Sequence, residues 1–270
     1  MSNFYGLIGE KLGHSFSPQI NKLILEKMKL KGEYNLFEIK KENLQKVLEG
    51  LKALEAKGVN ITIPYKIEII KYLDKLSKEA EKIGAVNTIS FSNGILTGYN
   101  TDYHGFGASL KNGQIDICNK DAVILGTGGA SKAVVQYLID NGIKDIIYIS
   151  RDPKNGLKKI KDFKIMSYKD MDNLGAKDII INCTPCGMYP EVECCPVNQK
   201  SLSRFSVAVD LIYNPDQTIF LKKSEELGLK TVNGLYMLVA QAVAAQEIWQ
   251  GVAIAEETTE EIYKEIRSKF

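Results

Sequence analysis

Residues 122–131 read Ala-Val-Ile-Leu-Gly-Thr-Gly-Gly-Ala-Ser, a pattern that predicts the local fold of the chain. Ala122–Leu125 is a short apolar run, typical of a strand buried in a parallel sheet. Apolar residues recur at helical spacing from Ala133 onward, so the glycines lie between a strand and a helix. Such a turn lets backbone N–H groups approach a pyrophosphate at the helix N-terminus. We therefore predict a dinucleotide-binding loop, rather than a flexible turn without a ligand, at Gly126, Thr127, Gly128, Gly129 and Ala130.

The end of the next predicted strand indicates which dinucleotide binds. NAD-selective folds place an acidic residue there, about 20 residues past the first glycine, to hold the ribose 2′-hydroxyl. Here the strand Ile146–Ile149 is followed by Ser150-Arg151-Asp152, and Arg151 can pair with a 2′-phosphate instead. We predict NADP as the cofactor. Two alternatives stay open: Asp152 could bind a ribose hydroxyl and admit NAD, and Arg151 could be a solvated surface residue.

Strands alternate with helices on both sides of the glycine loop. Downstream, the apolar strands Ile179–Asn182 and Val207–Leu211 predict a doubly wound parallel sheet. Upstream, the strand Phe4–Gly9 precedes a helix that Ser17 is expected to cap. Ser92-Asn93-Gly94 predicts a hairpin turn, so the two strands that it joins are expected to be antiparallel. The predicted fold class is therefore α/β with two domains: a mixed-sheet α/β domain and a doubly wound parallel-sheet (Rossmann) nucleotide domain.

The composition of the 270 residues is that of an ordinary globular protein. Lys and Arg number 35 and Asp and Glu number 33, a formal charge of +2 that argues against a nucleic-acid binder. No apolar run approaches the ~20 residues of a membrane span, and the first residues lack the pattern of a secretion signal. We therefore expect a cytoplasmic protein with neither nucleic-acid nor membrane partners.

Five cysteines are present, and an odd number favours reduced thiols over a disulfide framework in such a protein. Four of them fall in one short stretch, Cys183 and Cys186 followed by Cys194 and Cys195. A four-thiol metal site is disfavoured there, because adjacent cysteines rarely bind one ion with good tetrahedral geometry. We predict no metal.

Polar residues gather where the strands of the first domain end. Ser15 and Ser17 put two hydroxyls at a helix N-terminus, which suits an anionic group, although Ser17 could be only a cap. Asn60 and Thr62 share one face of the predicted strand Val59–Ile63, which Pro64 ends shortly before Lys66. An amide and a hydroxyl beside a lysine indicate a polyhydroxylated ligand; an exposed strand face beside a surface lysine is the alternative.

Two further polar residues, Asn87 and Asp102, follow later strands of the same domain. Taken alone, Asp102 is expected to cap a helix. Placed opposite Lys66, its carboxylate could instead exchange a proton with the lysine. The two histidines, His14 and His104, lack a clear partner in the sequence and are expected to be structural or peripheral.

Several motifs follow one another in the order of a known family. They are Ser15-Phe16-Ser17-Pro18, Asn60-Ile61-Thr62-Ile63-Pro64-Tyr65-Lys66, Gly84-Ala85-Val86-Asn87-Thr88, Asn100-Thr101-Asp102, Gly126-Thr127-Gly128-Gly129-Ala130, Asn182-Cys183-Thr184-Pro185, Asp210-Leu211-Ile212-Tyr213 and Gly234-Leu235-Tyr236-Met237. With these motifs the chain resembles the shikimate dehydrogenases along its whole length. The resemblance implies reversible NADPH-dependent reduction of 3-dehydroshikimate to shikimate, a step of aromatic amino-acid biosynthesis.

The resemblance also implies a role for each candidate residue. Lys66 and Asp102 would form the catalytic pair at the reacting oxygen and its neighbouring hydroxyl. Ser15 and Ser17 would hold the substrate carboxylate with help from Tyr213. The other implied substrate-binding residues are Asn60, Thr62, Asn87 and Gln241. Beyond the glycine loop, the implied cofactor-binding residues are Ser150 and Arg151 at the 2′-phosphate, and Thr184, Leu211, Gly234 and Met237 along the nicotinamide.

The order of the motifs predicts a substrate-binding domain at 1–101 plus 235–270 and an NADP-binding Rossmann domain at 102–234. We expect the active site in the cleft between the domains, and a monomer or homodimer. One alternative is an NAD-using quinate/shikimate dehydrogenase, although the two small hydroxyl residues Ser15 and Ser17 favour shikimate. The other is a non-catalytic sensor of shikimate and nucleotide, which the presence of both Lys66 and Asp102 disfavours.

Overall fold

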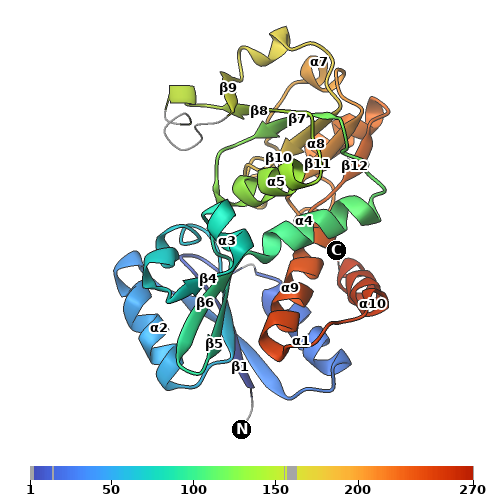
Figure 1. Cartoon of the computed structure of the whole chain (residues 1–270). Coiled ribbons are helices and arrows are strands. Elements are labelled where there is room, and N and C mark those ends of the chain that lie inside the picture. Colours follow the sequence, from blue (N-terminus) through green and yellow to red (C-terminus); the bar gives the residue numbers. More distant parts are fainter. Residues whose placement is uncertain (1–2, 14, 155, 157–162, 270) are drawn as a thin grey trace. The chain divides into compact units, whose positions relative to one another are not determined.

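The computed structural model describes residues 3–13, 15–154, 156 and 163–269, and divides into two compact units (Figure 1). Unit 1 is the chain up to Gly105 together with Val239–Lys269, and unit 2 is Phe106–Leu238. The divisions fall inside the helices α4 (Thr101–Asn112) and α9 (Leu235–Gln250). His14 lies outside the described residues.

Unit 1 is built on a six-stranded mixed sheet in the order β2-β1-β3-β5-β6-β4. Strand β1, next to the edge strand β2, pairs in parallel with β2 and β3, whereas β5 pairs antiparallel with both β3 and β6. The predicted mixed sheet is confirmed. The strands are β1 (Asn3–Gly9), β2 (Gly32–Glu38), β3 (Gly58–Ile61), β4 (Lys75–Leu76), β5 (Thr88–Ser92) and β6 (Ile95–Tyr99).

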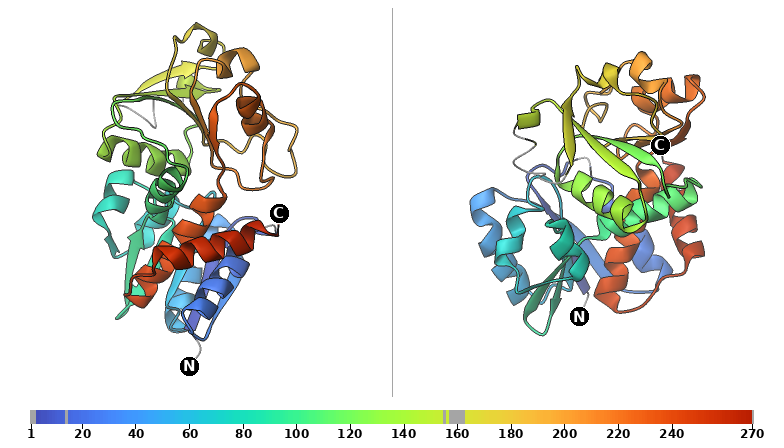
Figure 2. Two further views of the ribbon diagram at one scale, coloured as in Figure 1. Left: turned by 90° about the vertical axis from the view of Figure 1, so that its right-hand side faces the viewer. Right: turned by 45° about the horizontal axis from the view of Figure 1, so that its top comes forward.

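The helices of unit 1 include the C-terminal part of the chain. Trp249 in α9 stacks on Tyr5 of β1 and donates a hydrogen bond to the carbonyl of Ile89 at 3.0 Å. It lies over Gly58, where a Cβ would come within 1.9 Å of the indole nitrogen, so only glycine leaves the room. Helices α1 and α10 lie side by side (Figure 2). The other elements are α1 (Ser17–Lys27), α2 (Leu44–Ala53), α3 (Lys78–Ile83), α10 (Glu256–Arg267) and the 3₁₀ helices η1 (Lys41–Asn43) and η2 (Glu68–Tyr72).

Two local expectations in unit 1 are wrong. Helix α1 begins at Ser17 itself, so Ser17 is not its cap; the N–H of Ser17 instead donates to Ser15 Oγ at 3.2 Å. The strand expected to run to Ile63 ends at Ile61, which is buried. Ile63 is 72% exposed, because the chain turns at Pro64 before its side chain can join the core.

Unit 2 is a wholly parallel sheet in the order β12-β11-β10-β7-β8-β9. Numbered along the chain, this is the doubly wound order 3-2-1-4-5-6, in which the winding reverses between β7 and β10. The predicted Rossmann fold is confirmed. The strands are β7 (Asp121–Leu125), β8 (Asp145–Ser150), β9 (Lys164–Ser167), β10 (Ile179–Asn182), β11 (Val207–Asp210) and β12 (Lys230–Val232).

Apolar clusters cover both faces of this sheet. Ile124 of β7 belongs to the cluster that contains Val134, whereas its neighbour Val123 belongs to the cluster that contains Phe220. Burial on both faces explains the continuous apolar strands of the sequence. No helix in the described ranges has the length and apolar character needed to cross a bilayer. The helices are α5 (Gly129–Asp140), α7 (Gln199–Leu202), α8 (Ile219–Glu226) and the 3₁₀ helix η3 (Met171–Asn173).

Candidate active site

Lys66 and Asp102 form an ion pair in unit 1. Nζ of Lys66 lies 2.5 Å from Oδ2 of Asp102, and the two side chains are only 14% and 8% exposed. Asp102 lies in the first turn of α4, where the helix dipole favours a carboxylate. The expectation that Asp102 caps this helix is wrong, because α4 begins one residue earlier and the carboxylate turns toward Lys66.

Asn87 binds the second oxygen of the Asp102 carboxylate, the one that does not contact Lys66. Its Nδ2 donates to Oδ1 of Asp102 at 2.8 Å and to Oγ1 of Thr101 at 3.0 Å. Its own Oδ1 accepts the backbone N–H of Thr101 at 2.7 Å. All three residues are buried, where such bonds are stronger than in water. Both oxygens of Asp102 are therefore engaged, while a lysine ammonium has two donors beyond the one it gives to Asp102.

The polar network continues from Asn87 across the sheet to Ser17. Asn60 donates to the carbonyl of Asn87 at 3.2 Å and to Oγ1 of Thr88 at 2.9 Å. Its Oδ1 accepts the hydroxyl of Tyr34 at 2.7 Å. Burial raises the pKa of Tyr34, and a hydrogen bond with Ser17 opposes that rise. One connected set of bonds thus runs from the helix start at Ser17 to Asp102.

The remaining predicted residues of unit 1 lie at the edges of this network. Gln241 Oε1 is 3.5 Å from Oγ1 of Thr101. Ser15 accepts the N–H of Ser17, as described above. Thr62 packs its methyl group beside Gly9, where a Cβ would come within 2.7 Å of it. Sequence reasoning missed three members of the network because no motif gave them a role: Tyr34, Thr88 and Thr101.

The glycine loop of unit 2 lies where the sheet order reverses. Gly126 follows β7 with a φ of +93°, and a Cβ there would come within 2.8 Å of Cγ2 of Thr184, which follows β10. A side chain is therefore excluded twice, by conformation and by space. Gly128 precedes the first turn of α5, and a Cβ there would meet nothing within 4 Å. Open space beside backbone N–H groups at a helix N-terminus fits a pyrophosphate.

The next strand, β8, ends at the residues predicted to select the cofactor. Ser150 is buried, and its hydroxyl accepts the N–H of Asp152 at 3.2 Å. Arg151 is exposed. Burial raises the pKa of Tyr168, and the positive charge of Arg151 works against that rise, so the two side chains are close enough to interact. An exposed guanidinium at the end of β8 suits a phosphorylated ribose.

The residues predicted along the nicotinamide gather at the carboxyl ends of β10, β11 and β12. The N–H of Leu211 donates to the carbonyl of Asn182 at 3.1 Å. A Cβ on Gly234 would lie 2.1 Å from the carbonyl oxygen of Leu211, so only glycine fits. Met237 is buried in the core of unit 2. Burial raises the pKa of Tyr213, which also lies in unit 2; its implied role at the substrate carboxylate stays a prediction.

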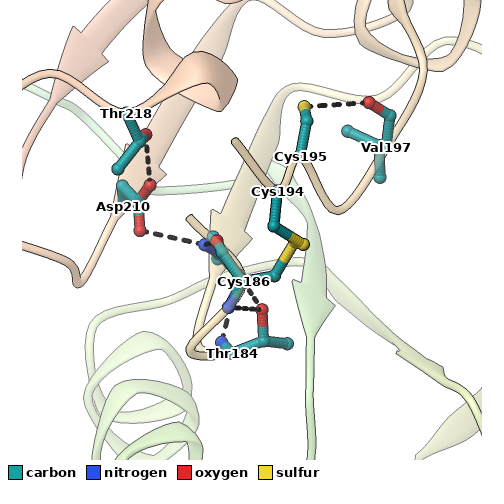
Figure 3. Close-up of a disulfide and its surroundings, with 8 residues drawn as sticks. Thr184, Cys186, Cys194, Cys195, Val197, Asp210 and Thr218 are labelled. Atoms are coloured by element: carbon teal, nitrogen blue, oxygen red, sulfur yellow. Dashed lines mark hydrogen bonds between the residues drawn. A yellow bond between two sulfur atoms is a disulfide. The ribbon is translucent and has the colours of Figure 1, made fainter. Parts of the chain in front are cut away.

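The expectation of reduced thiols throughout is wrong. Cys186 and Cys194 form a disulfide, and Cys118, Cys183 and Cys195 are free (Figure 3). The chain turns back at Gly187, whose φ is +100° and where a Cβ would lie 3.0 Å from the carbonyl oxygen of Cys194. This turn brings the two cysteines together. The odd number of cysteines in the sequence carries no information about such a contact. Within the described ranges, the structure has no cluster of His, Cys, Asp and Glu able to hold a metal.

The fold and the glycine loop define a class: the α/β proteins with a Rossmann nucleotide domain. A family model described as the shikimate dehydrogenase substrate binding domain matches residues 7–89. A shikimate dehydrogenase (NADP(+)) of Clostridium perfringens strain 13 is 47% identical over 268 residues, which cover 98% of this chain and 99% of the relative. The chain belongs to the shikimate dehydrogenase family.

Solved structures agree with this assignment. A chorismate mutase/shikimate 5-dehydrogenase fusion protein from Clostridium acetobutylicum matches with a TM-score of 0.97 and 50% identity, covering 100% of this chain and 98% of the other. The shikimate 5-dehydrogenase of Thermus thermophilus, solved in complex with NADP(H) and shikimate, matches with a TM-score of 0.88 and 30% identity. That match covers 97% of this chain and 99% of the other.

Proposed function

We propose that this protein catalyses the reversible, NADP-dependent interconversion of shikimate and 3-dehydroshikimate. The observation that carries the proposal is the Lys66–Asp102 ion pair, held by Asn87 in a buried polar network. The network lies in unit 1, most of whose N-terminal part matches the substrate-binding family model. Unit 1 is accordingly the substrate-binding domain, and unit 2 binds NADP.

Lys66 acts as the proton donor in ketone reduction. Bound NADPH supplies the hydride. Negative charge builds on the substrate oxygen as the carbonyl is reduced, and an ammonium stabilises that charge and then gives it a proton. Asp102 orients Nζ of Lys66 by accepting one of its hydrogens, and Asn87 fixes Asp102 in turn. In the oxidative direction, Lys66 takes the proton from the hydroxyl of shikimate.

Hydroxyl and amide groups of unit 1 bind the rest of the substrate. Ser15 and Ser17 bind the carboxylate at the start of α1, where the helix dipole favours an anion. The ring hydroxyls are bound by Asn60, Thr62, Asn87 and Gln241. Side chains fixed by their own hydrogen bonds, as Asn60 and Asn87 are, can discriminate ring stereochemistry.

The cofactor is bound by backbone groups and by one charged side chain. Gly126, Thr127, Gly128, Gly129 and Ala130 bind the pyrophosphate, because their N–H groups lie at the N-terminus of α5. Ser150 and Arg151 bind the 2′-phosphate, which accounts for a preference for NADP over NAD. The nicotinamide is bound by Thr184, Leu211, Gly234 and Met237. A cytoplasmic location, the lack of nucleic-acid partners and a monomeric or homodimeric state stay predictions.

A kinetic comparison of two substrates with two cofactors tests the proposal. The purified protein is assayed for absorbance of reduced cofactor with shikimate or quinate, each with NADP⁺ or NAD⁺. We expect the highest kcat/KM for shikimate with NADP⁺. A higher value for quinate with NAD⁺ would establish the quinate alternative, and binding of both ligands without turnover would establish the sensor.

A further inference from the structure

We propose that the Cys186–Cys194 disulfide is a thiol–disulfide exchange site that sets the affinity of unit 2 for NADP(H), an inference that rests on the proposed nucleotide site. The bond closes the segment 186–194, which begins shortly after β10 ends at Asn182. The disulfide, the glycine loop and the loops after β10 and β11 all belong to unit 2.

Both backbone polar groups of Cys186 are hydrogen-bonded to residues at the end of β10. Its N–H donates to Oγ1 of Thr184 at 3.3 Å, and its carbonyl accepts Nδ2 of Asn182 at 3.4 Å. Thr184 in turn donates to Oδ1 of Asn182 at 2.6 Å. One half of the disulfide is thus hydrogen-bonded to the residue assigned to the nicotinamide. The methyl group of Thr184 also lies where a side chain on Gly126 would stand, so a shift of Thr184 reaches the phosphate-binding loop.

The rest of the closed segment is tied to the loop after β11. The N–H of Tyr189 donates to the carbonyl of Asn214 at 3.0 Å, and Gly187 lies beside Thr218. Asp210 accepts from both Thr218 and Asn182, so the two loops share one buried anchor (Figure 3). With the disulfide intact, the segment is fixed at Cys186, at Tyr189 and at Cys194. Without it, the attachment at Cys194 is lost and the segment gains conformational freedom that nucleotide binding must remove.

The sulfur of Cys194 is the point of attack for a reductant, because Cys194 is exposed and Cys186 is half-buried. A thiolate of a dithiol attacks Sγ of Cys194, the Cys186–Cys194 bond breaks, and Cys186 leaves as a thiolate that takes a proton. The second thiolate of the dithiol displaces Cys194, which also takes a proton. In balance, two S–H bonds of the reductant and one protein disulfide become two protein thiols and one cyclic disulfide. A low-molecular-weight disulfide reverses the exchange.

The other nearby cysteines are poor competitors for this exchange. Burial raises the pKa of Cys183, and the charge of Asp210 adds to the rise, so its reactive thiolate form is suppressed. The thiol of Cys195 donates to the carbonyl of Val197 at 3.1 Å and points away from the disulfide (Figure 3). The Cys186–Cys194 pair is therefore the redox couple that this geometry selects.

The test compares NADP⁺ binding to the full chain in two redox states. Calorimetric titration is carried out on protein oxidised with a low-molecular-weight disulfide and on protein reduced with dithiothreitol. Thiol counting after denaturation verifies the states, with three thiols expected in the first and all five in the second. We expect reduction to raise the Kd for NADP⁺ roughly tenfold, the order expected when a few loop groups must be newly immobilised.

Two variants separate this bond from general thiol effects. Cys194→Ser is expected to bind NADP⁺ as weakly as the reduced protein and to ignore dithiothreitol. Cys118→Ser, which removes an exposed free thiol, is expected to respond as the wild type does. Equal Kd values in the two redox states, or five thiols in the oxidised protein, would overturn the inference and leave the proposed function standing. Failure of NADP⁺ to bind either form would overturn both. The wild-type comparison needs no substitution and holds whether or not a variant folds.

Discussion

Asp210, at the end of β11, is a buried carboxyl group whose titration makes unit 2 sensitive to pH. It is fully buried and accepts hydrogen bonds from Asn182, Ile212 and Thr218. Burial raises its pKa to about 7, and the three hydrogen bonds oppose that rise. An aspartate in an unfolded chain has a pKa of ~3.9. Between those two values the native protein holds a proton that the unfolded chain releases.

The raised pKa fixes the sign of the effect. The stability contributed by protonated Asp210 is fully present below about pH 4 and is lost as the pH rises through about 7. A rise of about 3 pKa units at ~1.36 kcal/mol each corresponds to about 4 kcal/mol. Asp210→Asn stays neutral and keeps an oxygen to accept from Asn182 and Ile212. We predict that the variant gains up to about 4 kcal/mol relative to the wild type between pH 4 and pH 8.

Urea unfolding of both proteins at a series of pH values measures this difference. Other groups titrate alike in the two proteins, so they cancel when one free energy of unfolding is subtracted from the other. Asp172→Asn is the matched control in the same unit, because a hydrogen bond from Ser201 lowers the pKa of Asp172. Its stabilising contribution is present above about pH 4 and is lost in more acid solution, so the difference for that variant should stay constant between pH 4 and pH 8 and should change, in the opposite direction, only below about pH 4. A difference for Asp210→Asn that stays constant between pH 4 and pH 8 would show that Asp210 does not hold a proton in the folded protein.

Three further substitutions test other parts of the structure. Gly234→Ala places a Cβ 2.1 Å from a carbonyl oxygen, so it should cost about 1–3 kcal/mol of stability and raise the KM for NADPH. The control Gly175→Ala, whose Cβ would meet no atom within 4 Å, should change neither quantity. Tyr34→Phe removes the donor to Asn60 and should cost about 1–3 kcal/mol in urea unfolding followed by the fluorescence of the single tryptophan; no loss would contradict the buried bond. Arg151→Ala should lower kcat/KM for NADP⁺ by roughly 10- to 100-fold and leave NAD⁺ unaffected, and equal losses would contradict its role at the 2′-phosphate.

The fold of unit 2 was predictable because its signals are local. A wholly apolar strand, a glycine turn and an amphipathic helix lie next to each other at residues 122–140, and burial on both faces of the sheet explains their pattern. The close approach of Gly126 to Thr184 also follows from the parallel order, since the carboxyl ends of neighbouring strands meet at one edge.

The network behind Lys66 was not predictable in the same way. Asn60 meets Thr88 because β3 and β5 pair in that register, and register depends on how whole strands align. Tyr34 lies on β2 and reaches Asn60 across β1, a contact between strands that no short motif encodes. The disulfide could not be predicted from the sequence for a similar reason. Its two cysteines meet through a turn at Gly187, whereas the count of thiols carries no geometry.

The proposed reaction depends on Lys66 acting at the reacting oxygen of the substrate. Steady-state kinetics of Lys66→Ala with shikimate and NADP⁺ tests it most directly, with Lys71→Ala as the control because that exposed lysine also pairs with an acid, Glu68. We predict that Lys66→Ala lowers kcat at least ~100-fold while the KM for shikimate changes far less, because the lysine acts mainly in the transition state. Lys71→Ala should match the wild type. A large rise in KM with kcat intact for Lys66→Ala would contradict a role for Lys66 in the transition state.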